Sequence, residues 1–223
     1  MGSSVDRKAE PRVPLSLERL LEAAIHLADE GGLDSLTMRK LGRKLGVEVM
    51  SLYYYVAKKD DILDGILDLV VTEIDAVTQE PTGWKPAIRA SAISAHEALE
   101  RHPWACGLWM SSGRVRPGRL RYMESMLGRL REAGFSAEST DRAYHALDSH
   151  IVGSTLWEVG YSGVVELPED YGATFLRSLP AGRYPYLAEH IEQHLSIPEP
   201  GETAFEFGLD LILDGLERIR VAG

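Results

Sequence analysis

The stretch TMRKLGRKLGVEVMSLYYYVAKK, residues 37–59, carries the clearest structural pattern in the N-terminal part of this 223-residue chain. It predicts a short helix that begins at Thr37, whose hydroxyl can accept a backbone N–H of the first turn, and that ends at Gly46. A turn of three or four residues then leads into another helix, over about residues 49–55. Two short helices joined by a glycine-containing turn are typical of a helix-turn-helix, whose second helix enters the major groove of DNA.

Charge is distributed unevenly around this motif. The whole chain has a formal net charge of −10. Residues 1–59 hold ten basic and eight acidic side chains, whereas residues 60–223 hold 14 and 26. The stretch quoted above holds six basic side chains and one acid, Glu48. A solvated helix face can produce such a cluster, but beside a helix-turn-helix pattern a basic patch indicates phosphate binding.

Helical patterns continue on both sides of the motif. Before it, apolar residues recur at three and four positions from Leu17 to Ala28, and Gly31-Gly32 closes that helix. After it, a helix from Lys58 to about Val77 is apolar on more than one face, which predicts packing on two sides. Further helices are expected over about residues 84–101, 104–112, 116–133, 138–161 and 203–221, with one or two shorter ones before the last.

No stretch of useful length alternates as a strand would, and no internal repeat is present. The sequence therefore predicts an all-α protein. We expect residues 1–60 to form a three-helix DNA-binding domain of the helix-turn-helix type, with residues 1–13 as a flexible arm. Residues 61–223 are expected to form a helical domain for ligand binding and dimerisation.

Nothing in the sequence favours export or a membrane. The longest apolar stretches have only a few residues, far below the roughly 18 that span a bilayer. The chain opens without a secretory signal pattern, and its single cysteine, Cys106, cannot form an intrachain disulfide. The seven histidines show no metal-ligand spacing. We expect a cytoplasmic protein without a cofactor or a bound metal.

The head of the chain resembles a known family. The stretch LTMRKLGRKLGVEVMSLYYYVAKKDDILDGI, residues 36–66, is similar to the head of the TetR family of bacterial transcriptional regulators, and specifically of the tetracycline repressor branch. The stretch FEFGLDLILDGLERI, residues 205–219, resembles the closing helix of that branch, and Trp84 and the EAGFS stretch at residues 132–136 are similar too. The resemblance implies a homodimeric repressor with a three-helix DNA-binding head and a helical ligand-binding core.

The same resemblance indicates that tetracycline is not the ligand. In the tetracycline repressor a magnesium-chelated drug is held through histidines. The corresponding positions in this chain are Asp75 and Trp109. We therefore expect a different effector.

The side-chain chemistry of the helix-turn-helix indicates which of its residues contact DNA. Phosphate contacts fix the register, whereas contacts with base edges read the sequence. Met50 and Ser51 suit base edges, and Arg39 can donate a bidentate pair of hydrogen bonds to guanine. One of three consecutive tyrosines, above all Tyr54, could instead pack inside the protein. The residues expected to face DNA are Thr37, Arg39, Met50, Ser51, Tyr53, Tyr54, Tyr55 and Lys59, and the family positions support all but the first and Tyr54.

Large aromatic and sulfur-containing side chains on the middle helices predict an effector site, although each is also typical of an ordinary core. We expect a largely apolar ligand of drug or metabolite size, aromatic compounds included. The helix from Lys58 to Val77 would transmit its binding to the head. The expected ligand-binding residues are Trp109, Met123, Met126, His145 and Trp157, with Ser91, Arg114 and Ser149 as polar contacts.

The last helix carries apolar residues on two faces, which predicts two partners. Phe205, Leu209 and Leu213 share one face. Ala204, Gly208, Leu211 and Gly215 form a second, smooth one. We expect this second face and the helix over 138–161 to build a four-helix interface between two copies of the chain.

Together these patterns predict a repressor that binds a palindromic operator as a homodimer and is released by a small effector. Two other functions stay open. One is an effector-independent DNA-binding protein. The other is an all-α enzyme with a structural helix-turn-helix, but we expect no enzyme because the chain has no Gly-rich phosphate loop, no His-Glu-x-x-His and no base beside Cys106.

Overall fold

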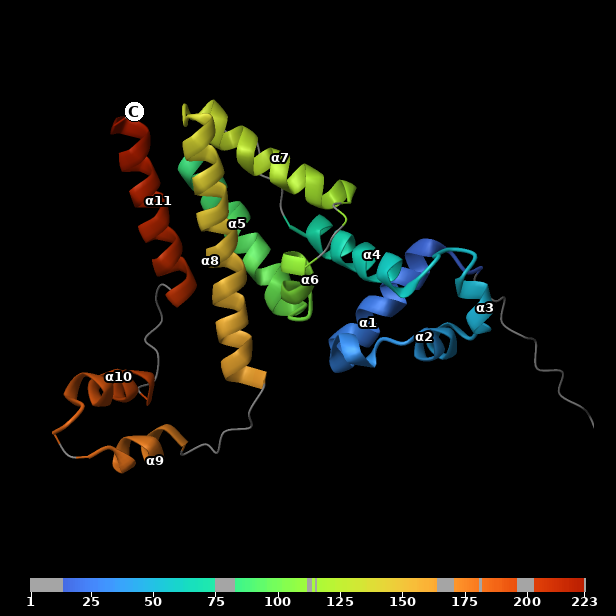
Figure 1. Cartoon of the computed structure of the whole chain (residues 1–223), viewed down its shortest axis with the longest axis horizontal. Helices are drawn as coiled ribbons and strands as arrows, with labels where there is room; N and C mark the ends of the chain where they lie inside the picture. The colour runs from blue at the N-terminus through green and yellow to red at the C-terminus, as the bar shows by residue number, and fades with distance from the viewer. Residues whose placement is uncertain are drawn as a thin grey trace, which may run out of the picture.

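The computed structural model describes residues 14–74, 83–111, 114, 116–163, 171–180, 182–195 and 203–222. Every regular element in these residues is a helix (Figure 1), which confirms the expected all-α fold. The expected arm at residues 1–13 and Asp75 lie outside the described part of the chain. The helices are α1 (Leu17–Ser35), α2 (Met38–Leu45), α3 (Val49–Leu52), α4 (Lys59–Thr72), α5 (Trp84–Arg101), α6 (Ala105–Ser111), α7 (Pro117–Glu132), α8 (Ala137–Gly163), α9 (Tyr171–Ser178), α10 (Pro185–Leu195) and α11 (Ala204–Ala222).

Local capping signals set the ends of the first two helices. The hydroxyl of Ser16 accepts a hydrogen bond from the backbone N–H of Arg19 at 3.2 Å, so it caps α1. The backbone of α1 leaves the helical conformation at Gly31 and Gly32, where the sequence predicted its end. Thr37 caps α2 as expected, because its hydroxyl accepts the backbone N–H of Lys40 at 3.2 Å.

The turn between α2 and α3 depends on a glycine. Gly46 has φ 67° and ψ 34°, a left-handed conformation that is costly for residues with a Cβ atom. The next residue, Val47, donates its backbone N–H to the carbonyl of Gly42 at 2.9 Å, which closes the end of α2. The second helix of the motif is shorter than expected: α3 ends at Leu52, and residues 53–55 form a turn.

α4 connects this head to the rest of the protein. Its side chains Ile62, Ile66 and Val70 are almost fully buried, and the helix packs against α1 on one side and α7 on the other. The two-sided packing expected from its apolar pattern is therefore confirmed. α4 ends at Thr72, whose hydroxyl bonds to the carbonyl of Leu69, and residues 75–77 of the expected helix are outside the described part.

The remaining body is built from α5, α6, α7, α8 and α11. α8 packs against both α5 and α11, and α7 packs against α4 and α8. Polar side chains also join α5 to α11: Arg89 pairs with Asp210 at 2.9 Å and with Glu206 at 3.2 Å. These helix boundaries agree with the predicted ones to within two residues.

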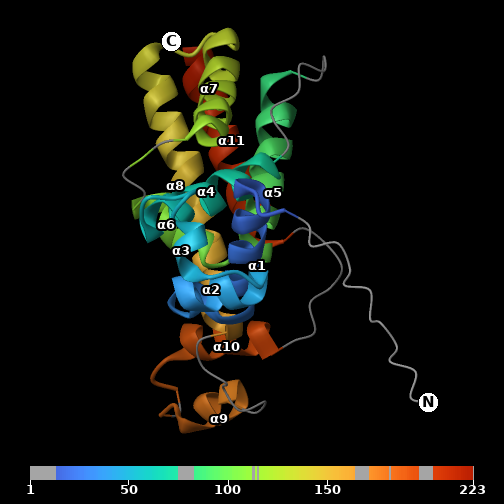
Figure 2. The ribbon, with the colours of Figure 1, turned by 90° about the vertical axis from the view of Figure 1, so that its right-hand side faces the viewer.

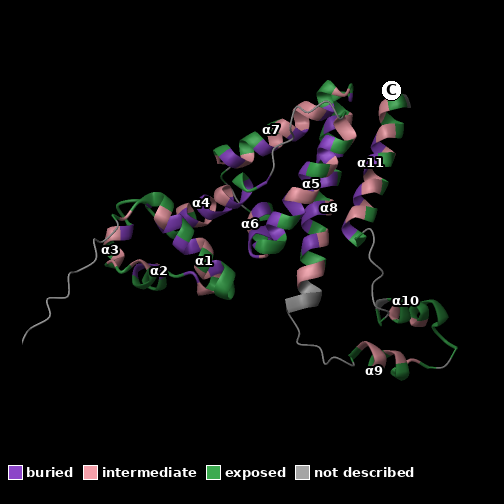
Figure 3. Ribbon diagram, turned by 180° about the vertical axis from the view of Figure 1, so that it is seen from behind, coloured by how far each residue is buried: buried purple, intermediate pink, exposed green. Residues whose placement is uncertain are grey.

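α9 and α10 form a pair that stands apart from the body. Figures 1 and 2 show both helices together at the end of the molecule opposite the C-terminus. No described residue in either helix is buried (Figure 3), and their exposed side chains include Tyr171, Phe175, Tyr186 and Leu195. Within the described residues, no helix has the length and apolar character needed to cross a membrane.

Candidate functional site

The residues expected to face DNA are accessible at the head. Seven of the eight are exposed, and Ser51 is half-buried. They lie on α2, on α3 and the turn after it, and at the first residue of α4, at the end of the molecule where Figure 1 shows α3. Met50 is 72% exposed although it is a large apolar side chain. An exposed methionine at this position is suited to an apolar contact with a base edge.

The three tyrosines do not behave alike. Tyr54 is 90% exposed, so the alternative that it packs inside the protein is wrong. The hydroxyl of Tyr55 donates a 2.6 Å hydrogen bond to the carbonyl of Leu15, before α1. Because this hydrogen bond uses the hydroxyl proton, Tyr55 ties the turn after α3 to the segment before α1 and does not donate to a phosphate. Tyr53 is 43% exposed, and among the described residues no hydrogen bond is recorded for its hydroxyl.

A carboxylate of α4 holds the beginning of α7. Oδ1 of Asp68 accepts the backbone N–H of Gly118 at 2.8 Å and that of Arg119 at 3.2 Å. Free N–H groups and the positive end of the helix dipole make this position favourable for a carboxylate. A Cβ atom on Gly118 would lie 2.9 Å from the carbonyl oxygen of Asp68, so the two helices approach as closely as glycine permits.

Arg114, an expected ligand contact, belongs to the same junction. Its guanidinium forms a 3.2 Å ion pair with the carboxylate of Asp61 on α4. Arg116 donates to the backbone carbonyl of Asp61 at 3.0 Å. The structure therefore places Arg114 at the junction between α4 and α7, and the expectation that it orients a ligand in the core is wrong.

A second polar junction joins the head to the corner between α5 and α6. Nδ1 of His102 lies 2.8 Å from Oδ1 of Asp29 on α1, and its Nε2 lies 3.3 Å from Oε1 of Glu73 at the end of α4. The indole N–H of Trp104 donates to the same Asp29 oxygen at 2.7 Å. No periodic pattern in the sequence indicates this junction, because its members come from three separate segments.

Trp109 lies in a polar cluster inside the core. It is 1% exposed, and its indole N–H donates to Oδ1 of Asp148 at 2.8 Å. Its ring meets that of Tyr122 edge to face, with centroids 5.6 Å apart, and the guanidinium of Arg119 lies 5.2 Å from its centroid. Side chains thus cover Trp109 closely.

The electrostatics of this cluster are unusual for a core. The Nε atom of Arg119 is buried and has no hydrogen-bond partner among the described residues. Burial raises the pKa of Asp148 above its usual value, and it raises the pKa of Tyr144 to about 12. Arg119, Tyr144 and Asp148 were not among the expected ligand residues, because single polar residues on apolar helices resemble surface positions in a sequence.

The eight expected ligand residues do not line one cavity. On α8, the buried stripe runs through Leu147 and Ile151. His145, Ser149 and Trp157 lie on the exposed side of α8, with the Trp157 side chain 68% exposed. The expectation that these three reach the same site as Trp109 is therefore wrong.

The other expected side chains are part of the packed core. Ser91 and Met126 are 2% and 1% exposed. Met123 is half-buried against the core. Trp109, Ser91, Met123 and Met126 thus belong to the core. The other expected ligand residues of α8 lie on its outer side, away from Trp109.

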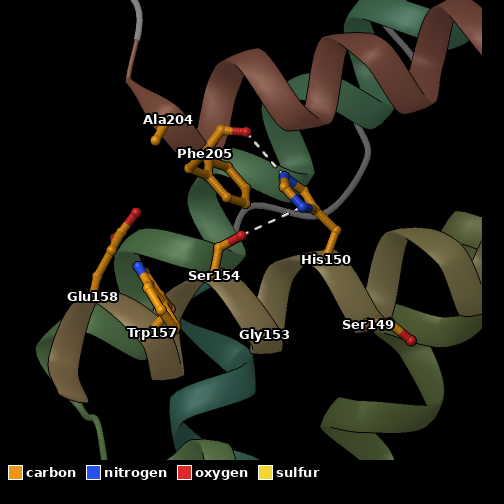
Figure 4. A pocket seen from close by; sticks show the side chains of 8 residues that line it. All are labelled: Ser149, His150, Gly153, Ser154, Trp157, Glu158, Ala204 and Phe205. Atoms are coloured by element: carbon orange, nitrogen blue, oxygen red, sulfur yellow. Dashed lines mark hydrogen bonds between the residues drawn. The ribbon is translucent and has the colours of Figure 1, made fainter. Parts of the chain in front are cut away.

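An open cavity of about 380 Å³ lies between α8 and the start of α11 (Figure 4). His150 crosses it: its Nε2 donates to the carbonyl of Phe205 at 2.9 Å, and its Nδ1 lies 3.3 Å from the hydroxyl of Ser154. Ser149 and Trp157 line the cavity wall on α8. This is where two of the expected ligand residues do meet.

The expected dimer face of α11 is exposed in part, and its role in a dimer stays a prediction. Ala204 is exposed, Leu211 is 60% exposed, and a Cβ atom added to Gly215 would meet nothing within 4 Å. Gly208 does not belong to this smooth face, because a Cβ atom there would lie 2.5 Å from the imidazole of His150 in the same chain. Its role is to let α11 approach α8.

Comparison with known proteins agrees with this architecture. Residues 20–66 match the family model of bacterial regulatory proteins of the tetR family, and residues 78–220 match that of the tetracyclin repressor-like C-terminal domain. The HTH-type transcriptional repressor DrrR1 of Streptomyces coeruleorubidus is 31% identical over 220 residues, which cover 93% of this chain and 79% of that protein.

Solved structures show the same fold. The crystal structure of a possible TetR family transcriptional regulator from Streptomyces coelicolor A3(2) is 31% identical, with a TM-score of 0.78 over 92% of this chain and 100% of that one. The structure of ActR from Streptomyces coelicolor in complex with actinorhodin is 26% identical, with a TM-score of 0.78 over 93% of this chain and 99% of that one. The likeness spans the head and the body alike.

Proposed function

The chain belongs to the TetR family of bacterial regulatory proteins and has a tetracycline repressor-like C-terminal domain, and from this we propose that it is an effector-released repressor of transcription. It binds a palindromic operator as a homodimer, and a small, largely apolar ligand releases it. Residues 1–60 form the DNA-binding domain, and residues 61–223 form the domain for ligand binding and dimerisation.

The head supplies the DNA contacts. Met50 and Ser51 face base edges, and Arg39 pairs with a guanine. Lys59 and the exposed hydroxyls of Thr37, Tyr53 and Tyr54 hold the phosphates, with backbone N–H groups at the start of α4 nearby. The acidic remainder of the chain keeps non-specific binding weak, because it repels DNA.

Two copies join through the outer side of α8 and α11. Phe207 and Leu211 on α11 and Trp157 on α8 are 58%, 60% and 68% exposed, an apolar surface larger than single scattered residues provide. The α9–α10 pair also exposes aromatic side chains, and none of its described residues is buried. A second copy that packs against these surfaces forms the four-helix interface typical of helical dimers.

The ligand acts at the Trp109 cluster. The observation that carries this proposal is the double position of Arg119, whose guanidinium lies over Trp109 while its backbone N–H bonds to Asp68 on α4. A planar aromatic ligand with an acceptor group could stack on Trp109 and satisfy the unpartnered Nε of Arg119. The related ActR protein has been solved with actinorhodin, which supports a small molecule as the ligand of this chain.

Because side chains fill the space around Trp109, a ligand enters by moving α7 away from α6 and α8. The first residues of α7 are tied to Asp68, so this movement carries α4 and with it the head. A ligand switches the protein only if it binds the arrangement that cannot hold DNA more tightly than the one that can. A swing from 1:99 to 99:1 requires about 5.5 kcal/mol of differential binding.

The test begins with duplexes selected by the full chain from a random DNA library, followed by titration at several salt concentrations. We expect a palindrome whose half-sites are separated by roughly one helical turn or more, with affinity that falls as salt rises. A thermal-shift screen with polycyclic aromatic compounds then identifies ligands, which are added to the operator complex. Selection of no palindrome would overturn the DNA part, and a ligand that stabilises the free protein without lowering operator affinity would overturn the switching part.

A further inference from the structure

A histidine and two glutamates converge where α5 crosses α8. Nε2 of His96 lies 3.1 Å from a carboxylate oxygen of Glu158 and 3.9 Å from one of Glu100. One atom from each of the three side chains lies within 4.8 Å of the other two. His96 and Glu100 are one helical turn apart on α5, so they share a face, and Glu158 comes from α8.

The hydrogen bonds of His96 determine what its Nε2 atom can do. Nδ1 lies 2.8 Å from the hydroxyl oxygen of Thr155, and that hydroxyl donates its single proton to the carbonyl of Ile151 at 2.9 Å. Nδ1 must therefore carry a proton and donate it to Thr155. Nε2, on the other side of the ring, then faces the carboxylates of Glu100 and Glu158, where its lone pair can bind a cation.

The ring of His96 is held in place on its flat side as well. It stacks on Phe205 with centroids 3.9 Å apart and planes 8° apart, and it is 7% exposed. A ring that is oriented by a hydrogen bond from the far nitrogen is the usual arrangement of a histidine that binds a metal. Held in this way, Nε2 has little freedom to turn toward solvent.

We propose that His96, Glu100 and Glu158 bind a divalent zinc ion. Imidazole nitrogen and carboxylate oxygen are ligands that zinc accepts, whereas calcium and magnesium prefer oxygen alone. Metal–ligand bonds of about 2.1 Å in a tetrahedral site separate neighbouring ligand atoms by roughly 3.4 Å. The separations of 3.1 and 3.9 Å need only small side-chain adjustments to match this value. Three protein ligands leave a fourth position for water or another donor.

The bound zinc would tie α5 to α8 beside the first turn of α11. Glu158 also lines the open cavity of Figure 4, so one ligand of the zinc belongs to its wall. The sequence offered no sign of this site, because Glu100 and Glu158 lie 58 positions apart. The expectation that the chain binds no metal came from spacing alone, and it does not extend to ligands brought together by the fold.

The experiment titrates zinc into the full chain after treatment with a chelator, with a chromophoric chelator as competitor. We expect one tight zinc ion for each chain, a higher melting temperature with zinc, and a tetrahedral visible spectrum when cobalt replaces zinc. Glu158→Gln and His96→Gln should each lower zinc affinity at least tenfold, and Thr155→Val should lower it about 10–100-fold through the orientation of the ring.

The control is His145→Gln. His145 also has a neighbouring carboxylate, since its Nε2 lies 3.6 Å from Asp141, but its side chain is 69% exposed and it lies outside the proposed site. It should leave zinc affinity unchanged. Equal zinc affinity in the wild type, Glu158→Gln and His96→Gln would overturn the proposal. A wild-type chain that binds no zinc would overturn it as well.

Discussion

The carboxylate of Asp68 on α4 accepts the backbone N–H of Gly118 at 2.8 Å, so one helix caps the next. This contact joins the helix that leaves the DNA-binding head to the helix that covers Trp109. It is a direct connection between the two proposed sites, because α4 and α7 also pack closely at Gly118.

Gly118→Ala should separate the two helices. The added Cβ atom would lie 2.7 Å from Oδ1 and 2.9 Å from the backbone oxygen of Asp68, and the backbone cannot turn away as a side chain can. We expect a loss of roughly 1–3 kcal/mol in the free energy of unfolding, together with a changed operator affinity. Gly128→Ala on the same helix is the control, because its Cβ atom meets nothing within 4 Å; it should be neutral or stabilising by about 0.5–1 kcal/mol. Equal denaturation curves for the two variants would contradict the close contact.

Tyr55→Phe should lower the stability of the protein, whereas Tyr54→Phe should lower its affinity for DNA. Tyr55→Phe removes the hydrogen bond to Leu15 and should lower the free energy of unfolding by about 0.5–1.5 kcal/mol. Tyr54→Phe removes an exposed hydroxyl and should leave stability unchanged while weakening binding to all DNA sequences alike. Urea unfolding and anisotropy titrations distinguish them, and a stability loss in Tyr54→Phe would contradict its assignment to phosphate.

Arg39→Ala should relax the sequence preference as well as weaken binding. A bidentate contact with guanine contributes about 1–3 kcal/mol of discrimination between bases. Lys59→Ala, which removes a charge from the phosphate contacts, should weaken specific and non-specific duplexes by the same factor. Competition titrations with single-base variants of the operator measure this. Unchanged preference in Arg39→Ala would assign that residue to phosphate instead.

Leu211→Arg should split the dimer. It places a charge in the middle of the exposed apolar face of α11, where an unpaired buried cation is costly. Light scattering at micromolar concentration should give the mass of one chain, and operator binding should weaken because half-sites are no longer joined. Leu120→Arg, at a 54% exposed position on α7, should remain dimeric. A wild-type chain that is itself a monomer would overturn the proposed interface.

Asp148→Asn should flatten the pH dependence of stability. Burial raises the pKa of Asp148 above its usual 3.8, so folding favours the protonated form, and this contribution is lost as pH rises through the raised value. Asparagine keeps an acceptor for Trp109 but cannot ionise. We expect the variant to equal or exceed the wild type at neutral pH, by no more than about 1 kcal/mol. Parallel unfolding free energies across the acidic range above pH 3.8 would contradict it.

Local signals in the sequence predicted the head well. Thr37 and Gly46 act through their own side chain or backbone conformation, so their neighbours along the chain suffice to identify the ends of α2. The length of α3 was overestimated because three tyrosines continue a helical pattern, whereas the hydrogen bond of Tyr55 to Leu15 comes from a residue 40 positions away.

The body was harder to predict for a physical reason. Apolar residues occur all round α8, so periodicity does not tell which of Leu147 and Trp157 faces the core. The answer depends on the helices that pack against α8, which are α5, α6, α7 and α11. Junctions such as that of Asp29, His102 and Glu73 depend on three segments at once, and no pattern within one segment predicts them.

Because Asp68 binds backbone atoms of α7, the side chains around Trp109 and the connection between α4 and α7 could change independently. The donors at this contact are main-chain amides, which every residue except proline provides, and the acceptor alone is a side chain. Substitutions along α7 beyond Gly118 can therefore change the side chains around Trp109 without removing the backbone hydrogen bonds to Asp68. Under the proposed function, the ligand preference of this protein could therefore change while the connection from α7 to α4 stays the same.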